Sequence, residues 1–423
     1  MQAFGKRNGL AYGLLGLPLA FVALPLYVIL PNYYAKEFGV PLAILGAILL
    51  GARLFDAFID PLLGALSDRL FARSANAVLQ AGVLAAVVLA AGFALLFFPQ
   101  VKTPNAVIVW ATVMLMVTYA AYSFLSVSHQ SWGAMLGGNE AERSRIVAWR
   151  EALGLVGVVL ASVTPVALGM PATTAIFFVA LGVGWLAWTR AVQPVAKKDA
   201  PLVPGAIWLP FQHNNFKRLL LVFMLNGTAS AVPATLVLFF IQDRLQAPSS
   251  MEPLFLGSYF LAAAVSIPLW LAIVKRIGLA KAWLCGMALS IAVFSWATQI
   301  GSGQTTAFLV ICALSGVALG TDLALPGAML AGVIQANGDS GKSEGAYFGW
   351  WNFAIKLNLA LAAGLALPLL GVFGYSPGVR SAEALQALVI AYCVLPCVLK
   401  LAASAALYFF IIQPISTNVK AAA

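Results

Sequence analysis

The chain has 423 residues, of which 62% are hydrophobic and only 9% are charged, and its mean hydropathy is +0.95. Charged residues make up about a quarter of an ordinary domain, so this composition excludes a soluble globular protein. The formal net charge of +10 would suggest nucleic acid as a partner of a soluble protein, but in a membrane protein the basic residues mainly set the orientation. We therefore expect a polytopic helical protein whose surroundings are the lipid bilayer, with no nucleic-acid partner.

Apolar segments long enough to cross the roughly 30 Å hydrocarbon core follow one another along the whole chain. In chain order they cover residues 9–31, 40–66, 76–98, 106–130, 149–169, 172–193, 216–241, 253–274, 281–300, 305–333, 346–371 and 384–412. The first follows Lys6 and Arg7 as a signal peptide would, but it is long and lacks a polar cleavage region, so we expect a retained helix. The sequence thus predicts an all-α protein with twelve transmembrane helices.

A single long polar connection divides the twelve segments into six and six. We expect an N-terminal half at residues 1–193, a cytoplasmic linker at 194–215 and a C-terminal half at 216–423. "PLLGALSDRL" after the second span resembles "PLWLAIVKRI" after the eighth, and "GAML" closes both the fourth and the tenth. Two parallel six-helix repeats are the architecture of major facilitator transporters, which hold substrate between the halves. Carriers of this fold can work as monomers, which is our expectation here.

Lysine and arginine are distributed unequally between the two faces of the predicted membrane domain. Outside the spans, the only basic residues in the odd-numbered loops are Lys36, Lys102, Arg244 and Arg380, whereas the chain has 24 in total. Because cytoplasmic loops carry the excess of positive charge, both termini are expected in the cytoplasm. We expect a multi-pass protein of the cell inner (plasma) membrane.

The second span carries three charges within its apolar sequence. Arg53, Asp56 and Asp60 are three and four residues apart, so they lie along one face of a helix. A charge at mid-bilayer costs about 2.5–3.5 kcal/mol, which requires an interior partner, and Arg53 neutralises only one aspartate. The remaining charge is balanced by Na⁺, with the Ala57 carbonyl freed by Pro61 as a further ligand, or by a proton. The alternative is a salt-bridge cluster that only holds helices together.

Other charged residues lie deep in later spans. Lys356, in the eleventh span, needs a carboxylate partner, for which Asp56 or Asp60 is our first expectation and Asp322, in the tenth span, the alternative. Lys400, in the twelfth span, has no evident partner in the sequence.

Several polar and aromatic side chains are candidates for contact with a substrate. Arg150 either holds a polar substrate by bidentate hydrogen bonds or anchors the start of the fifth span. Tyr119 and Trp351 belong to a group of aromatic residues that either stack on a sugar face or form interfacial belts. The sequence contains no P-loop, catalytic triad or metal-ligand cluster, so we expect neither an enzyme nor a cofactor besides the coupling ion.

Three stretches of this sequence resemble the glycoside-pentoside-hexuronide:cation symporter family (melibiose-permease-like) of the major facilitator superfamily. "ARLFDAFIDPLLGALSDR" resembles its second helix, "NEAERSRIVAWREALG" its fourth-to-fifth loop and "EGAYFGWWNFAIKL" its eleventh helix. The resemblance implies a cation site at Asp56 and Asp60, with Lys356 nearby and Arg150 on the substrate. It also implies a cytoplasmic latch in "GALSDRLFAR", formed by Asp68, Arg69 and Arg73.

The family's acidic sugar-binding residues are replaced by Ala20 and Ser123 in this chain, and the hydroxyl ligand after Tyr119 is replaced by Ala120. We expect cation-coupled (Na⁺ or H⁺) secondary transport of a small, sugar-like organic solute by alternating access, with Ser123 among the substrate contacts. The alternatives are transport of an amphipathic lipid such as a lysophospholipid, or an uncoupled lipid flippase.

Overall fold

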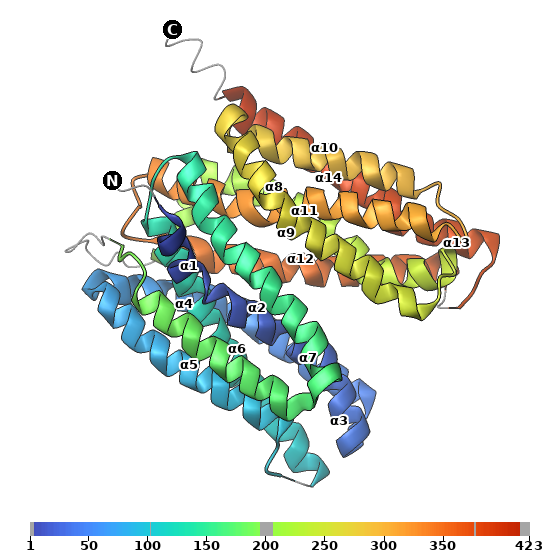
Figure 1. Ribbon diagram of the computed structural model, residues 1–423, viewed down its shortest axis with the longest axis horizontal. Helices are drawn as coiled ribbons and strands as arrows, with labels where there is room; N and C mark the ends of the chain where they lie inside the picture. Colours follow the sequence, from blue (N-terminus) through green and yellow to red (C-terminus); the bar gives the residue numbers. More distant parts are fainter. Residues whose placement is uncertain (1–3, 102, 195–205, 376–377, 415–423) are drawn as a thin grey trace. The chain divides into compact units, whose positions relative to one another are not determined.

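A computed structural model describes residues 4–101, 103–194, 206–375 and 378–414. These residues form helices joined by short connections, without a strand among them (Figure 1). Up to the middle connection the helices are α1 (Lys6–Gly13), α2 (Gly16–Leu24), η1 (Pro25–Ile29), α3 (Leu30–Phe38), α4 (Leu42–Arg73), α5 (Ala75–Phe97), α6 (Pro104–Met135), α7 (Glu140–Thr189) and η2 (Ala206–Gln212). After it they are α8 (Asn214–Phe239), η3 (Phe240–Arg244), η4 (Ser249–Met251), α9 (Glu252–Ile277), α10 (Leu279–Ala297), α11 (Thr305–Ala336), α12 (Glu344–Val372), α13 (Ala382–Val389), η5 (Ile390–Val394), α14 (Leu395–Leu407) and η6 (Tyr408–Ile412).

These helices account for the twelve predicted spans. Nine helical segments of the described chain are long and apolar enough to cross a membrane, and α4 and α12 have comparable lengths of 32 and 29 residues. The remaining span comes from α7, whose 50 residues are interrupted at Gly169, where φ is 79° and ψ is 168°. That backbone conformation is essentially restricted to glycine, so Gly169 separates the fifth span from the sixth.

Prolines explain why the first and last spans each contain a wider, π-helical turn. The π-helical turns η1 and η5 are each followed, two residues later, by a proline, Pro31 and Pro396 respectively. A proline has no N–H to donate to the carbonyl four residues earlier, here that of Tyr27 or Tyr392. The helix widens for one turn around each of these carbonyls, which is a usual cause of a π-bulge.

Contacts divide the chain into two compact units. Unit 1 comprises Met1–Gln212 with Ala331–Phe353, and unit 2 comprises His213–Leu330 with Ala354–Ala423. The first boundary falls within the predicted linker 194–215, of which residues 195–205 lie outside the described residues. The end of α11 and the beginning of α12 group with unit 1, although the sequence analysis assigned them to the C-terminal half.

Glycines bring α2 and α7 of unit 1 into backbone contact. A Cβ on Gly157 would lie 2.1 Å from the carbonyl oxygen of Leu17, and one on Gly16 would lie 2.6 Å from that of Arg150. Small residues at such positions allow close helix packing in membranes. The start of α7, with Arg150, is thereby held directly against α2.

A second close approach, also within unit 1, joins α4 to the beginning of α12. A Cβ on Gly64 would lie 2.0 Å from the Gly345 carbonyl oxygen. One turn further on, the Asp68 carboxylate accepts hydrogen bonds from the backbone N–H groups of Gly345 and Ala346, at 2.6 and 2.8 Å. Asp68 therefore caps the N-terminus of α12, where unsatisfied N–H groups and the helix dipole favour a negative charge.

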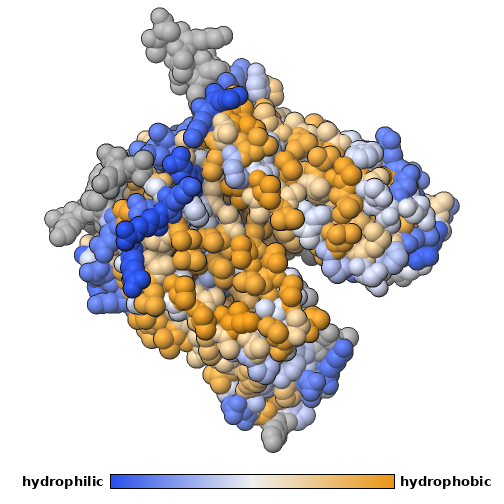
Figure 2. Space-filling model, in the orientation of Figure 1, coloured by the Kyte–Doolittle hydropathy of each residue, from blue (hydrophilic) through white to orange (hydrophobic). Residues whose placement is uncertain are grey.

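The outward faces of the helices are hydrophobic, as lipid contact requires. Figure 2 shows hydrophobic residues over the middle of the helices and hydrophilic residues gathered near helix ends. Large apolar side chains with more than half of their surface exposed include Phe58, Leu84, Val166, Val179, Leu261 and Val265. Because a soluble protein rarely exposes such surface, these faces fit the hydrocarbon of a bilayer.

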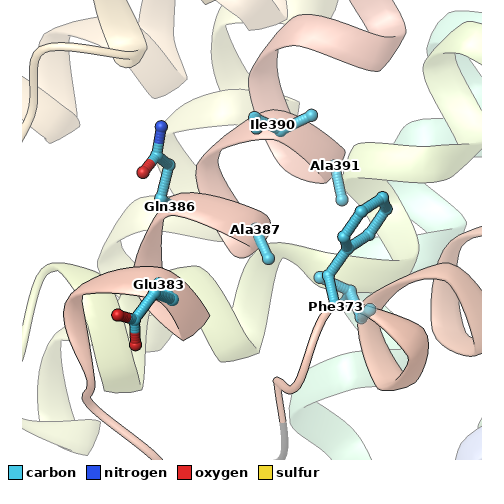
Figure 3. A pocket seen from close by; sticks show the side chains of 7 residues that line it. Phe373, Glu383, Gln386, Ala387, Ile390 and Ala391 are labelled. Atoms are coloured by element: carbon cyan, nitrogen blue, oxygen red, sulfur yellow. The ribbon is translucent and has the colours of Figure 1, made fainter.

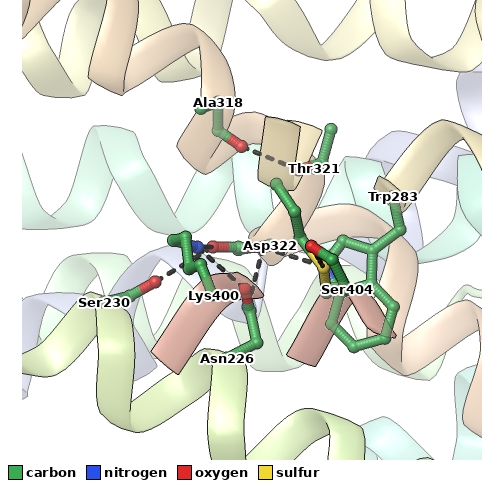
Figure 4. A network of polar contacts seen from close by, with 9 residues as sticks. Asn226, Ser230, Trp283, Ala318, Thr321, Asp322, Lys400 and Ser404 are labelled. Carbon is green, nitrogen blue, oxygen red and sulfur yellow. Dashed lines mark hydrogen bonds and ion pairs between the residues drawn. The ribbon is translucent and has the colours of Figure 1, made fainter. Parts of the chain in front are cut away.

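A network of polar side chains crosses the interior of unit 2 (Figure 4). The Lys400 ammonium on α14 donates to the carboxylate of Asp322 on α11 at 3.1 Å and to the amide oxygen of Asn226 on α8 at 2.8 Å. Asp322 accepts three more hydrogen bonds, from Asn226 at 2.9 Å, Ser230 at 3.1 Å and the Trp283 indole at 2.8 Å. Four donors stabilise the ionised carboxylate. The ion pair and its hydrogen bonds therefore link α8, α10, α11 and α14 of unit 2.

We expect removal of one member of this pair to destabilise the protein strongly. Asp322→Ala leaves the Lys400 ammonium buried without its counterion, and breaking a buried pair in this way costs about 3–5 kcal/mol. The measurement is the thermal unfolding midpoint of the purified protein in detergent.

The double variant Asp322→Leu/Lys400→Met leaves no unpaired charge and should lose less stability than the two single changes added together. Glu383→Ala, at an exposed position of α13, is the control and should leave the midpoint nearly unchanged. Strictly additive losses at Asp322 and Lys400 would contradict this account of the network.

Candidate functional site

The two aspartates of the second span lie on α4 in the interior of unit 1. Asp56 is 1% exposed and Asp60 is 0% exposed. The hydroxyl of Ser123, on α6, donates a hydrogen bond to Oδ1 of Asp56 at 2.7 Å. Two buried carboxylates one helical turn apart, with a hydroxyl oxygen beside one of them, form a set of hard oxygen ligands suited to a small cation or a proton.

Arg53 and Tyr119 lie near this pair. Arg53 is an exposed residue, and its guanidinium lies over the ring of Tyr27, 4.6 Å from its centroid, in a cation–π contact. Tyr119 is 1% exposed, and its ring centroid lies 5.9 Å from that of Tyr27. Tyr27 therefore connects the expected charge partner Arg53 with the expected substrate residue Tyr119.

Arg150 forms an ion pair with the residue that follows it. Its Nε donates to Oε1 of Glu151 at 2.9 Å, and its Nη2 donates to the same oxygen. The two side chains are 16% and 25% exposed. The Arg150 side chain is therefore partly accessible in the interior of unit 1, as a substrate-binding residue has to be. Its charge is neutralised by Glu151.

Reciprocal hydrogen bonds between Tyr12 and His129 lie close to this ion pair. The Tyr12 hydroxyl donates to the His129 carbonyl at 3.0 Å, and His129 Nε2 lies 2.7 Å from the Tyr12 carbonyl oxygen. Tyr12 in turn interacts electrostatically with Arg150. His129 is fully buried, so its role in the structure is to join α1 to α6.

The remaining expected site residues lie on α11 and α12. Trp351 is buried at 4% exposure, and Lys356 is partly buried on the part of α12 that belongs to unit 2. The pairing of Lys356 with Asp56 or Asp60 stays a prediction. For Asp322 the structure supplies Lys400 as the ion-pair partner, instead of the Lys356 that the sequence offered as an alternative.

The three residues of the expected cytoplasmic latch have different surroundings. Asp68 is 7% exposed and caps α12 through two backbone N–H groups. Arg69 and Arg73 are exposed side chains on the last turns of α4. Of these three residues, Asp68 is the one whose side chain bonds α12 within unit 1.

Three functional contacts were missed by the sequence analysis. Ser123 was expected to contact substrate, but its hydroxyl is directed to Asp56, so we group it with the carboxylate pair. Glu151 was not singled out, and Lys400 was left without a partner. Asp322 was considered only as an alternative partner of Lys356, and matching it with Lys400 would have found their ion pair.

Unit 2 also contains a pocket of about 230 Å³ between the end of α12 and the α13–η5 segment (Figure 3). It is lined by Leu370, Phe373, Glu383, Gln386, Ala387, Ile390 and Ala391. Only Glu383 and Gln386 are polar members of this lining. None of the expected site residues lines the pocket, so the carboxylates of α4 with Ser123 and Arg150 remain the candidate site.

Comparison with solved structures supports the fold. A bacterial homologue of the iron transporter ferroportin in an outward-facing state has a TM-score of 0.68 and 15% identity, with 95% of this chain and 98% of that chain covered. The Escherichia coli fucose:proton symporter has a TM-score of 0.70 and 13% identity, with 95% and 99% covered. At these identities the likeness shows the fold alone, and it confirms the predicted major facilitator fold.

Curated relatives are more similar in sequence. An uncharacterized symporter of Bacillus subtilis is 25% identical over 381 residues, covering 85% of this chain and 82% of the relative. A putative sulfoquinovose importer of Salmonella typhimurium is 24% identical over 405 residues, covering 89% and 83%. These relatives are consistent with the symporter family that the sequence motifs indicated.

A family model described as MFS/sugar transport protein matches residues 9–414, nearly the whole chain. The family and the structural neighbours are transporters, in agreement with the expectation that the chain is not an enzyme. The chain belongs to the MFS/sugar transport protein family and is a multi-pass membrane transporter with the major facilitator fold.

Proposed function

We propose that this protein is a cation-coupled secondary transporter that moves a small, sugar-like solute across the membrane by alternating access. The observation that carries the proposal is the burial of Asp56 and Asp60 on one spanning helix, with the Ser123 hydroxyl bound to Asp56. Ionisable residues inside a membrane are costly and mark ion or substrate pathways. Membership of a sugar transport family supports the solute class.

Electrostatic repulsion between the carboxylates provides the coupling. Two negative charges within one helical turn disfavour each other in a low-dielectric interior. Binding of Na⁺ or H⁺ removes that repulsion and stabilises the arrangement that accepts the solute. Because linkage is reciprocal, the solute tightens cation binding by the same factor, which for such couplings is about 5–150-fold.

The polar interior of unit 1 supplies the solute contacts in this proposal. Arg150 provides guanidinium donors for hydroxyl oxygens, and Tyr119 and Trp351 provide aromatic faces for a sugar ring. The names of two relatives, a putative sulfoquinovose importer and a putative glycoside/cation symporter of Escherichia coli, support a carbohydrate-like solute. We place the protein in the cell inner membrane as a monomer, with both termini in the cytoplasm, on the distribution of Lys and Arg.

We predict that Asp56→Asn and Asp60→Asn each abolish cation-driven accumulation, because an amide neither carries the charge nor takes up the proton. Uptake by purified protein in proteoliposomes, driven by an imposed Na⁺ or H⁺ gradient, measures this. Accumulation should fall about tenfold or more, towards simple equilibration. Glu37→Gln, at an exposed position of α3, is the matched control. Wild-type accumulation in both aspartate variants would refute the mechanism.

Ser123→Ala should weaken Na⁺ binding without removing transport, because it deletes the hydroxyl oxygen that we count among the hard ligands beside Asp56. Loss of one group from such a ligand set lowers metal affinity by about tenfold or more. The Na⁺ concentration for half-maximal uptake should therefore rise by that factor, with the maximal rate largely kept. Thr112→Val on the same helix, where among the described residues the hydroxyl bonds the Ile108 carbonyl, should leave the Na⁺ dependence unchanged.

A ligand panel separates the sugar proposal from the lipid alternative. Purified protein is titrated with hexoses, hexuronates and a lysophospholipid, with and without Na⁺ and at two pH values. We expect cation-dependent binding of a sugar, because Arg150 and Glu151 place a polar ion pair in the interior. Cation-independent binding of the lysophospholipid alone would favour an uncoupled flippase.

A further inference from the structure

The ion pair between Arg150 and Glu151 has an unusual geometry for two adjacent residues of a helix. Neighbours in sequence point about 100° apart around a helix and do not face each other. Here both side chains bend together, so that Nε and Nη2 of Arg150 donate to Oε1 of Glu151. Such a pair gives the helix little local stability, so the reason for it lies in what surrounds the two charges.

These surroundings are the polar interior of unit 1. The Tyr122 hydroxyl on α6 interacts electrostatically with Asp56 and Asp60, and the same hydroxyl interacts with Arg150 and Glu151. The Arg150–Glu151 pair therefore shares one electrostatic neighbourhood with the candidate cation site. A charge inside unit 1 near these residues needs a counterion. For Arg150 that counterion is Glu151, the next residue in the sequence.

One carboxylate oxygen satisfies two donors of Arg150, which leaves hydrogen-bonding capacity on both partners. Among the described residues, Oε2 of Glu151 accepts no hydrogen bond, and the Glu151 side chain is 25% exposed. The pair therefore offers a solute an acceptor at Oε2 beside guanidinium donors, while its net charge is zero. Adjacent hydroxyl groups of a sugar match this arrangement, since one donates to Oε2 while the other accepts from Arg150.

We propose that Glu151 is a specificity residue that makes the site select neutral, hydroxyl-bearing solutes over solutes carrying a carboxylate or sulfonate. This inference rests on the proposed transport of a sugar-like solute. An anionic solute finds the charge of Arg150 already neutralised by Glu151, and its own charge repels the Glu151 carboxylate that lies beside the remaining guanidinium donors. A neutral hydroxyl pair binds without breaking the ion pair.

The test compares sugars that differ only at C6, where a hydroxymethyl group replaces a carboxylate: D-galactose with D-galacturonate, and D-glucose with D-glucuronate. Uptake of each is measured in proteoliposomes containing the full-length protein under the driving cation gradient. The wild-type protein should prefer the neutral member of a pair. Glu151→Gln keeps the shape of the side chain but frees the charge of Arg150, and should shift the ratio of uronate to hexose uptake upwards by about tenfold or more.

Two variants control for the change of charge. Glu151→Asp keeps the counterion and should retain the wild-type preference. Glu140→Gln removes one negative charge from an exposed position at the start of the same helix and should leave the ratio unchanged. The double variant Arg150→Gln/Glu151→Gln removes the freed charge together with its counterion, so the uptake that it retains should lack the gain in the ratio of uronate to hexose.

The outcomes separate this inference from the proposed function. Transport by the wild-type protein with an unchanged ratio in Glu151→Gln overturns the role of Glu151 alone, as does a wild-type preference for the uronates. A gain in uronate uptake in the double variant equal to that in the single one also overturns it. Wild-type protein that takes up neither member of either pair, under Na⁺ or H⁺ gradients, contradicts the sugar assignment itself, and the inference falls with it.

Discussion

The free-energy cost of placing carboxylates inside hydrocarbon is the constraint on which the rest of this structure depends. Asp56 and Asp60 are almost fully buried on a helix that crosses the membrane. They are tolerated because the face of α4 that carries them packs against α6, where Ser123 donates to Asp56. The same constraint pairs Arg150 with Glu151 and Lys400 with Asp322. The two ion pairs differ in accessibility, since Glu151 is partly exposed whereas four donors surround Asp322.

That difference separates a site that can bind a ligand from one that holds helices together. The carboxylate of Asp322 has all its usual acceptor positions filled by Lys400, Asn226, Ser230 and Trp283. It has no capacity left for a ligand, so its contribution is to the rigidity of unit 2. Among the described residues, Oε2 of Glu151 accepts no hydrogen bond and lies beside Arg150. We therefore place the selective chemistry of the transporter in unit 1.

Much of the fold was predictable because hydropathy is a long-range average over about twenty residues. The twelve spans, the single polar connection and the charged face of α4 all followed from such averages or from helical spacing.

The partners of individual charges were harder to predict from the sequence. The contact of Ser123 with Asp56 joins α4 to α6, and that of Lys400 with Asp322 joins α14 to α11. Such contacts depend on how each helix is rotated about its axis against its neighbour, which the sequence of one helix does not specify. The ion pair of Arg150 with Glu151 escaped prediction for the opposite reason, because adjacent residues are not expected to face each other on a helix.

The break at Gly169 also affects how unit 1 can move. The fifth and sixth spans meet at one residue in a conformation that suits glycine almost exclusively. No loop connects the two spans, so one arm of α7 cannot move along the membrane normal while the other stays in place. Whatever displaces the end of α7 that carries Arg150 and Glu151 must carry the arm ending at Thr189 with it. The two arms of α7 are therefore coupled along the membrane normal through Gly169.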